Sequence, residues 1–248
     1  GEVLAAPQSD GEVVIAQAYD GKLMAFDFAT GEKLWTFAND VPVLTLRGTS
    51  TPIISNNIAI AAFAGGKVIA VSLDSGNVVW EARVAIAQGR SEIERIVDID
   101  GTMATQGAEL YVASYQGRIV AIEMRAGRKL WQRNISSVSG VSVGFGNVYA
   151  ADEDGTISAF LRNGQSIRWQ NIDLGYRELS RPTPISSYVA VADFEGYLHL
   201  LSQVDGVIVG RARPDGDGAR ADMIAKGNAL YVYGNSGDLI AYDIEAKD

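Results

Sequence analysis

The chain has 248 residues, 47% of them hydrophobic and 21% charged, which is enough apolar material to bury the core of an ordinary globular protein. Its net charge of −9 argues against nucleic acid or an anionic membrane surface as a partner, because both repel an acidic protein. The chain contains no cysteine, which excludes disulfides, thiol nucleophiles and cysteine-ligated metals, and it contains no run of 18 apolar residues of the kind that spans a bilayer.

One segment of the chain recurs about every 40 residues. Its first copy, 20–35, has a turn glycine, an apolar stretch, a second turn glycine and a tryptophan fourteen residues after the first glycine. The tryptophans are Trp35, Trp80, Trp131 and Trp169, and the fifth copy has Gly210 in their place. A period near 40 residues with strand-like contents is typical of a repeat protein. The first glycines of the six copies are Gly21, Gly66, Gly117, Gly155, Gly196 and Gly237.

Each copy is predicted to form four short antiparallel strands. In the second copy we expect them at about 51–55, 58–63, 67–73 and 77–83, where β-branched and aromatic residues are frequent. Between the second and third strands of each copy stands a pair such as Asp-Gly or Gly-Gly, and glycine suits a hairpin position with positive φ. The third strand is apolar on both faces of its pleat, so each sheet is expected to be covered on both sides.

Tandem four-stranded sheets that are covered on both sides predict an all-β fold, a β-propeller of four-stranded antiparallel blades. We expect a single propeller domain over 1–248. The sequence stops after the third strand of the sixth copy, and no strand at the start of the chain remains to complete that blade. We therefore expect the C-terminal part of a larger ring rather than an unusual six-bladed one. The predicted blades lie near 2–38, 51–83, 102–134, 141–171, 183–211 and 221–245.

The repeated tryptophans are interpreted as structural residues. An indole at a fixed place on each outer strand would pack on the next blade and bury apolar area worth about a few kcal/mol. The single histidine, His199, stands in a third strand at a mostly apolar position. We expect it to be buried and hydrogen-bonded rather than catalytic, because no nucleophile motif surrounds it and one histidine cannot form a histidine-rich metal site.

Three aspartate-rich turns admit a calcium hypothesis, namely 98–101, 152–155 and 215–218. None of them has the twelve-residue ligand spacing that ends in glutamate. Asp-Gly is also ordinary turn chemistry. We therefore predict turns, and no metal or cofactor site.

The connections between blades differ in length, and variable loops are where binding usually occurs. The first connection carries Leu44, Leu46 and Arg47. Apolar residues beside an arginine are typical of interface hot spots, so these three are predicted to bind a partner. The alternative is that the leucines are tucked under the blade.

The longest connection, 85–100, ends with Asp98 and Asp100. It also contains Ser91-x-x-Glu94, which as a capping box predicts one short helical turn. In an antiparallel blade, the connections to the next blade and the hairpins between the second and third strands fall on one face. The two connections belong to neighbouring blades and are expected to form one surface, in which Asp98 and Asp100 supply complementary charge. The alternative for Asp100 is that it caps a turn.

The segments AFDFATGEKLW and AVSLDSGNVVW resemble the repeat of the PQQ-type propellers, in which this tryptophan docks one blade on the next. Three segments make the whole chain similar to the BamB family: LTLRGTSTP, GRSEIERIVDIDGTMAT and LSRPTPISSYVAVADFEGYLHLLS. That family is the lipoprotein subunit of the bacterial β-barrel assembly machinery and faces the periplasm from the outer membrane. The resemblance implies eight blades, of which about six are present here, and an N-terminal lipid-bearing cysteine absent from this chain.

The resemblance further implies a scaffold that is not an enzyme and that binds the POTRA domains of BamA. The matching positions are Leu44, Leu46, Arg47, Asp98 and Asp100. Other subunits of the machinery and unfolded outer-membrane proteins are the further partners it implies, with a lipid as the only membrane contact. Two alternatives stay open: a PQQ- and calcium-dependent quinoprotein dehydrogenase, which would need converging carboxylates and a base, and a generic protein-binding propeller.

Overall fold

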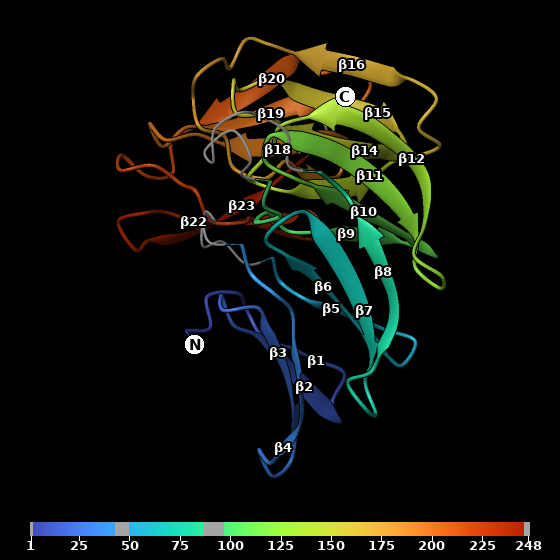
Figure 1. Ribbon diagram of the computed structural model, residues 1–248. Coiled ribbons are helices and arrows are strands. Elements are labelled where there is room, and N and C mark those ends of the chain that lie inside the picture. The colour runs from blue at the N-terminus through green and yellow to red at the C-terminus, as the bar shows by residue number, and fades with distance from the viewer. Residues whose placement is uncertain (1, 43–49, 87–96, 246–248) are drawn as a thin grey trace. The chain divides into compact units, whose positions relative to one another are not determined.

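The computed structural model describes residues 2–42, 50–86 and 97–245 (Figure 1). Over these ranges the strands form six antiparallel sheets, five with four strands and one with three. The described ranges contain no helix, and therefore none with the length and apolar character to cross a bilayer. The chain divides into two compact units, 1–140 and 141–248, and each is described by itself. The single domain over 1–248 stays a prediction.

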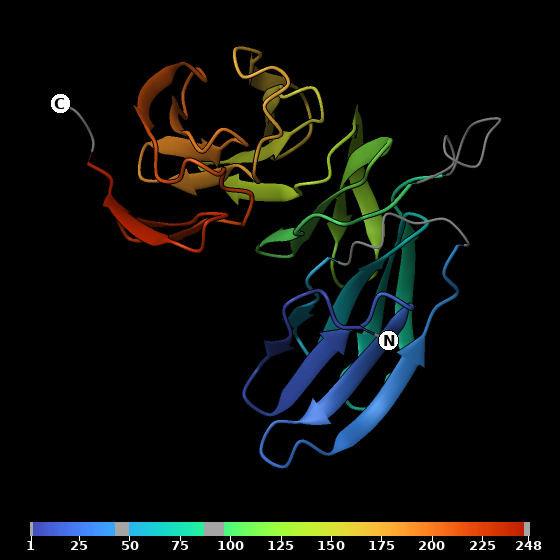
Figure 2. The same cartoon turned by 90° about the vertical axis from the view of Figure 1, so that its left-hand side faces the viewer.

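The first unit contains three sheets, which we name blades 1 to 3. Blade 1 consists of β1 (Gln8–Ser9), β2 (Val13–Gln17), β3 (Lys22–Asp27) and β4 (Lys33–Ala38). Blade 2 consists of β5 (Ile53–Ser55), β6 (Ile58–Phe63), β7 (Lys67–Ser72) and β8 (Val78–Arg83). Blade 3 consists of β9 (Ala104–Gln106), β10 (Glu109–Ala113), β11 (Gly117–Glu123) and β12 (Arg128–Ile135). In Figure 2, blade 1 is blue, and β4 forms one edge of the sheet.

The second unit contains blades 4 to 6. Blade 4 consists of β13 (Val141–Gly144), β14 (Asn147–Ala151), β15 (Ile157–Leu161) and β16 (Ile167–Asn171). Blade 5 consists of β17 (Thr183–Ile185), β18 (Tyr188–Ala192), β19 (Leu198–Ser202) and β20 (Ile208–Ala212). Blade 6 consists of β21 (Ile224–Lys226), β22 (Ala229–Tyr233) and β23 (Leu239–Asp243). In every blade, strands that follow each other in sequence are neighbours in the sheet.

The strand predictions for the second copy are confirmed to within two residues. The second strand has the predicted ends, the third ends one residue earlier, and the first begins two residues later. The blades are the antiparallel four-stranded units of a β-propeller, which confirms the predicted fold class. We call the strands of each blade A to D in chain order.

Within each unit, the core lies between consecutive blades. Between blades 1 and 2 it contains Leu23 and Val71, and between blades 2 and 3 it contains Val68 and Ile122, all of them fully buried. Val68 and Val71 both belong to β7 and serve different interfaces, which confirms that this sheet is covered on both sides. In the second unit, one cluster joins blades 4 and 5 and another joins blades 5 and 6.

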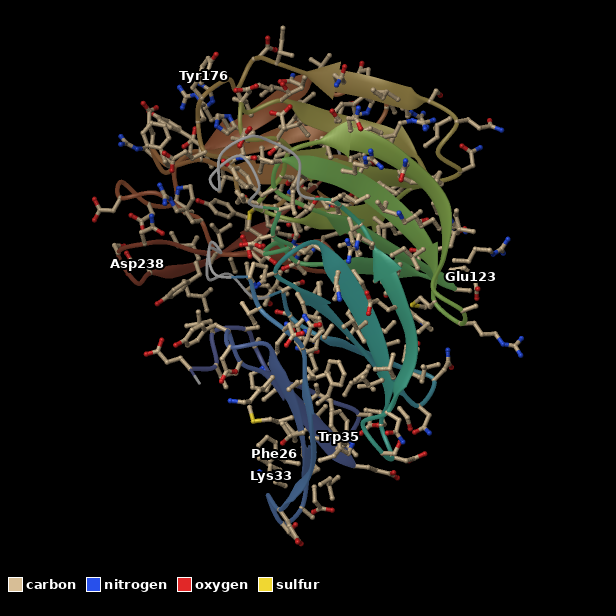
Figure 3. The ribbon with its side chains drawn as sticks, viewed as in Figure 1. Phe26, Lys33, Trp35, Glu123, Tyr176 and Asp238 are labelled. Atoms are coloured by element: carbon tan, nitrogen blue, oxygen red, sulfur yellow. The ribbon has the colours of Figure 1, made fainter. Side chains whose placement is uncertain are left out.

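Trp35, Trp80 and Trp169 each join one blade to the next by the same kind of hydrogen bond. The indole Nε1–H donates to a backbone carbonyl just before the C–D turn of the following blade. Trp35 is labelled in Figure 3, beside the turn between β7 and β8. The fourth, Trp131, packs against Tyr111 of its own blade with the ring centroids 6.0 Å apart. The bonds are Trp35 to Leu73 at 2.6 Å, Trp80 to Met124 at 2.7 Å and Trp169 to Gln203 at 3.0 Å.

The glycine of the C–D turn is required by this contact. Gly76 has a φ of +70°, and a Cβ on it would lie 2.8 Å from the ring of Trp35. Gly127 stands in the same relation to Trp80. A side chain at either position would both strain the backbone and displace the indole. The regular spacing of glycine and tryptophan in the sequence is therefore one packing unit shared by two blades.

Blade 5 lacks the tryptophan and fills its space differently. In blades 1 to 4 the residue opposite the tryptophan across the C–D ladder is an alanine, and the register shifts immediately after it. In blade 5 the pair is Leu200 and Gly210, and a Cβ on Gly210 would lie 3.4 Å from Leu200 Cδ1. In blade 5 the larger side chain of the pair therefore stands on strand C, whereas in blades 1 to 4 it stands on strand D.

Replacing Trp80 with alanine is expected to lower the free energy of unfolding by about 3–5 kcal/mol, because it opens a cavity between blades 2 and 3. It also removes the hydrogen bond to the Met124 carbonyl. Leu34→Ala is the control, since that side chain is 50% exposed, and it should cost less than about 1 kcal/mol. Urea unfolding of both variants measures the difference. Equal losses would contradict a docking role for the indole.

Candidate functional site

The candidate site lies where two connections meet the B–C turn of blade 2, residues 64–66. Connection 1 leads from β4 to β5 and connection 2 from β8 to β9. The predicted binding residues Leu44, Leu46 and Arg47 lie outside the described residues, as does the helical turn predicted at Ser91–Glu94. The structure describes the flanks of both connections, together with Asp98 and Asp100.

The flanks of the two connections meet at one glycine. Pro42 Cγ lies 3.2 Å from the position that a Cβ on Gly65 would take, and the Gly65 amide donates a hydrogen bond of 3.1 Å to Asp98 Oδ1. Near the end of connection 1, the buried Ser50 hydroxyl donates to the carbonyl of Gly101 at 2.8 Å. The first flank of connection 1 therefore packs beside Gly65, which is bonded to Asp98, and the second flank is bonded directly to Gly101. Asp98 and Gly101 both lie in the last part of connection 2.

Asp98 has a structural role that the sequence did not reveal. Its side chain is buried, with 1% exposed, and its own carbonyl accepts a hydrogen bond of 2.9 Å from the amide of Tyr115 in blade 3. Since its carboxylate holds Gly65 of blade 2, Asp98 links two blades at the candidate surface.

Asp98 accepts a hydrogen bond from the backbone amide of the residue just before the turn glycine. In each of blades 2 to 6, the amide at this position donates to a side-chain oxygen. In blades 4 and 5 the oxygen belongs to the aspartate that opens the same turn. In blades 2 and 3 it belongs to the connection that follows the blade, and in blade 6 it belongs to the connection that precedes the blade. The five bonds are Gly65 to Asp98, Gln116 to Ser136, Asp154 to Asp152, Glu195 to Asp193 and Ser236 to Asp215.

The same bonds account for the three aspartate-rich turns. Asp152 Oδ1 also accepts from the amide of Thr156 at 2.8 Å, and Asp215 Oδ1 accepts from the amide of Asp217 at 2.8 Å. These carboxylates accept hydrogen bonds from backbone amides of turns, which fits the interpretation of these motifs as turns rather than calcium sites. Among the described residues, no group of three or more histidine, cysteine, aspartate or glutamate side chains is placed to hold a metal ion.

Asp100 is half-buried next to Asp98. Among the described residues, its Oδ1 atom has no hydrogen-bond partner. Burial and the neighbouring charge of Asp98 raise the pKa of Asp100 to about 7. The carboxyl group therefore changes charge near neutral pH, at the edge of the candidate surface.

A pocket of about 530 Å³ opens beside these flanks. The pocket was not predicted from the sequence. One signal for it was available, because a single copy has a basic residue both at the start of strand C and at the end of strand D. The pocket is contained in the first unit. It is lined by Asp40, Val41, Pro42, Ala64, Gly65, Lys67, Arg83 and Ile86.

His199 is fully buried in blade 5, which confirms that it is a hydrogen-bonded core histidine. Its Nε2 atom is 2.9 Å from Asp193 Oδ2, and Arg211 Nε–H donates to its Nδ1 atom at 3.2 Å. The same Asp193 oxygen also accepts from Arg177 at 2.6 Å. Burial alone would raise the pKa of Asp193, but the hydrogen bonds from His199, Arg177 and the amide of Tyr197 together lower it.

Residues 1–171 match the family model described as outer membrane protein assembly factor BamB. The chain belongs to the BamB family. BamB of Pseudomonas aeruginosa is 52% identical over 204 residues, which are 82% of this chain and 54% of that protein. BamB of Yersinia pestis is 33% identical over 242 residues, which are 98% of this chain and 62% of that protein.

The crystal structure of BamB from Moraxella catarrhalis has the same fold, with a TM-score of 0.91 and 30% identity. The match covers 98% of this chain and 72% of that one. These matches confirm the predicted BamB family and its propeller fold. The chain spans 54% and 62% of the length of the two curated BamB relatives.

His199 is the only histidine, so NMR can follow its ring protons without ambiguity as pH changes. We expect a pKa below the ordinary 6.5, because burial disfavours the imidazolium and Arg211 occupies Nδ1. The unfolded chain then binds this proton more readily than the folded one. Folding therefore loses the contribution of His199 as pH falls through 6.5. A measured pKa at or above 6.5 would contradict the arrangement.

Asp100→Asn is expected to stabilise the protein at pH 8. The pKa of about 7 lies above the ordinary 3.8, so ionised Asp100 costs stability as pH rises between these values. The advantage of the asparagine should shrink as pH falls below 7. Urea unfolding at pH 8 and pH 5 measures it. Asp98→Ala is the contrasting variant and should lose about 1–3 kcal/mol by leaving the Gly65 amide unpaired. An Asp100→Asn variant no more stable than wild type at pH 8 would refute the assignment.

Proposed function

We propose that this chain is a non-enzymatic scaffold of the outer-membrane β-barrel assembly complex, and that it binds the periplasmic POTRA domains of BamA through its two connections. The proposal is supported by membership of a family described as outer membrane protein assembly factors. The observation that carries it is the joining of the two connections at Gly65 and Gly101. Connections tied at their flanks present a preorganised surface, which loses less entropy on binding.

In this proposal Leu44 and Leu46 are the apolar anchors, and Arg47 pairs with a carbonyl or carboxylate of the POTRA domain. Asp98 holds the B–C turn beneath the partner. Asp100 supplies charge at the edge of the surface that depends on pH. Each of these roles needs rigid support, which the docked blades give.

The proposed location is the periplasmic face of the outer membrane, where a lipid on the whole protein would be the only membrane attachment. Other subunits of the assembly complex are further proposed partners. The scaffold would assist folding and insertion by holding BamA in a posture that accepts unfolded outer-membrane proteins. Those clients could also add a strand to a blade, because the outer strands β4, β8, β12, β16 and β20 each have only one strand neighbour among the described residues.

Leu44→Asp and Arg47→Ala are expected to abolish co-purification with BamA while leaving the fold intact. The first variant places a charge in an apolar contact, and the second removes the cation. Circular dichroism and urea unfolding check the fold. Leu34→Asp, an exposed leucine of β4 outside both connections, is the matched control and should retain BamA.

If both variants recovered BamA at the wild-type level, the two connections would not be the docking site. If wild-type protein failed to recover BamA, the proposed partner itself would be wrong. The control variant separates these results from a general effect of added negative charge.

A further inference from the structure

The pocket beside Gly65 contains two cations that face each other. Lys67 begins β7 and Arg83 ends β8, and the two residues are direct partners across the strand pair. Like charges in this relation destabilise a sheet. The corresponding pairs in blades 1 and 3 contain a single cation, Lys22 opposite Ala38 and Arg118 opposite Asn134. Blade 2 therefore carries an unfavourable charge pair that these two blades avoid.

The two cations differ in how they are neutralised. Lys67 Nζ is 3.2 Å from Glu81 Oε1 in an ion pair. Arg83 is exposed and forms no ion pair or side-chain hydrogen bond with any described residue, so its guanidinium is available to a ligand. A guanidinium can bind both oxygens of a carboxylate through two parallel hydrogen bonds.

The rest of the pocket wall is mostly apolar. Val41 and Pro42 come from the flank of connection 1, and Ile86 comes from the flank of connection 2 with 60% of its surface exposed. An exposed isoleucine beside an unpaired arginine is the pairing found at protein interfaces rather than at sites for small ions. The opposite side is the B–C turn, which Asp98 holds in place.

We propose that this pocket receives an acidic side chain of the docked protein, with the carboxylate on Arg83 and Lys67 and an adjacent apolar residue on Ile86 and Pro42. The inference rests on the proposed docking function and names the chemistry of the partner at that site. A singly charged carboxylate fits better than a phosphate group. Lys67 is already paired and Asp40 stands in the wall, so little positive charge is left for a doubly charged ligand.

In the free protein, the ion pair of Lys67 with Glu81 offsets part of the repulsion between the two cations. A carboxylate between Lys67 and Arg83 would turn the remaining repulsion into attraction for a shared anion. That remaining cost is present in the free protein and relieved on binding, which favours the bound state.

Calorimetric titration of the purified protein with purified BamA POTRA domains from the same organism tests this inference. Arg83→Glu should weaken binding by about tenfold or more, and Lys67→Gln should weaken it less, because Lys67 keeps a partner in the free protein. Lys33→Glu is the matched control, since it makes the same charge change at an exposed cation at the start of β4 (Figure 3). It should bind within about twofold of wild type.

The direct evidence is rescue. A lysine placed at the partner's contacting acidic residue, found by an aspartate and glutamate scan, should restore binding to Arg83→Glu but weaken binding to wild type. If Arg83→Glu binds like Lys33→Glu while Leu44→Asp still abolishes binding, the acidic-residue pocket is refuted and the docking function stands. If wild type does not bind the POTRA domains, the docking function fails, and this inference fails with it.

Discussion

Each unit depends on the packing of one blade on the next, which is fixed where an indole donates a hydrogen bond to the neighbouring blade's backbone. Isolated four-stranded sheets of this size would leave one or both apolar faces in water, so each is stable only with a neighbour. The contact of Trp80 with Gly127 and Met124 sets both the distance and the direction of that packing, because a hydrogen bond is directional and apolar burial is not. This packing also positions the turns and connections at the ends of the blades.

The fixed positions of these turns and connections make the candidate surface possible. The B–C turn of blade 2 is held from outside its own hairpin, by Asp98 of the following connection, and Ser50 bonds the end of connection 1 to Gly101. A loop whose flanks are held by hydrogen bonds can present apolar and charged groups in a defined geometry. Arg83 of the adjacent pocket is positioned differently, by its place at the end of β8.

Much of the fold could be predicted from the sequence because the information is local and repeated. Val68 and Val71 reveal a two-sided sheet by their spacing alone, and His199 is recognisable as a core residue from its column in the repeat. The candidate site was less accessible to such reasoning. Asp98 looks like a surface charge in sequence, and its burial depends on a turn 33 residues away. The pairing of Lys67 with Arg83 depends on strand register, which the C–D bulge shifts by one residue.

The exchange of sizes between Leu200 and Gly210 bears on how such arrays diverge. A tryptophan introduced at Gly210 alone would overfill the space, and an alanine introduced at Leu200 alone would leave a void, so neither single step back to the common pattern is neutral. The two positions are therefore coupled. A designed repeat that averages the copies would restore both residues together. Moving one strand from blade 5 into another blade would instead combine two large or two small side chains at this pair, a mismatch that is not visible in either strand alone.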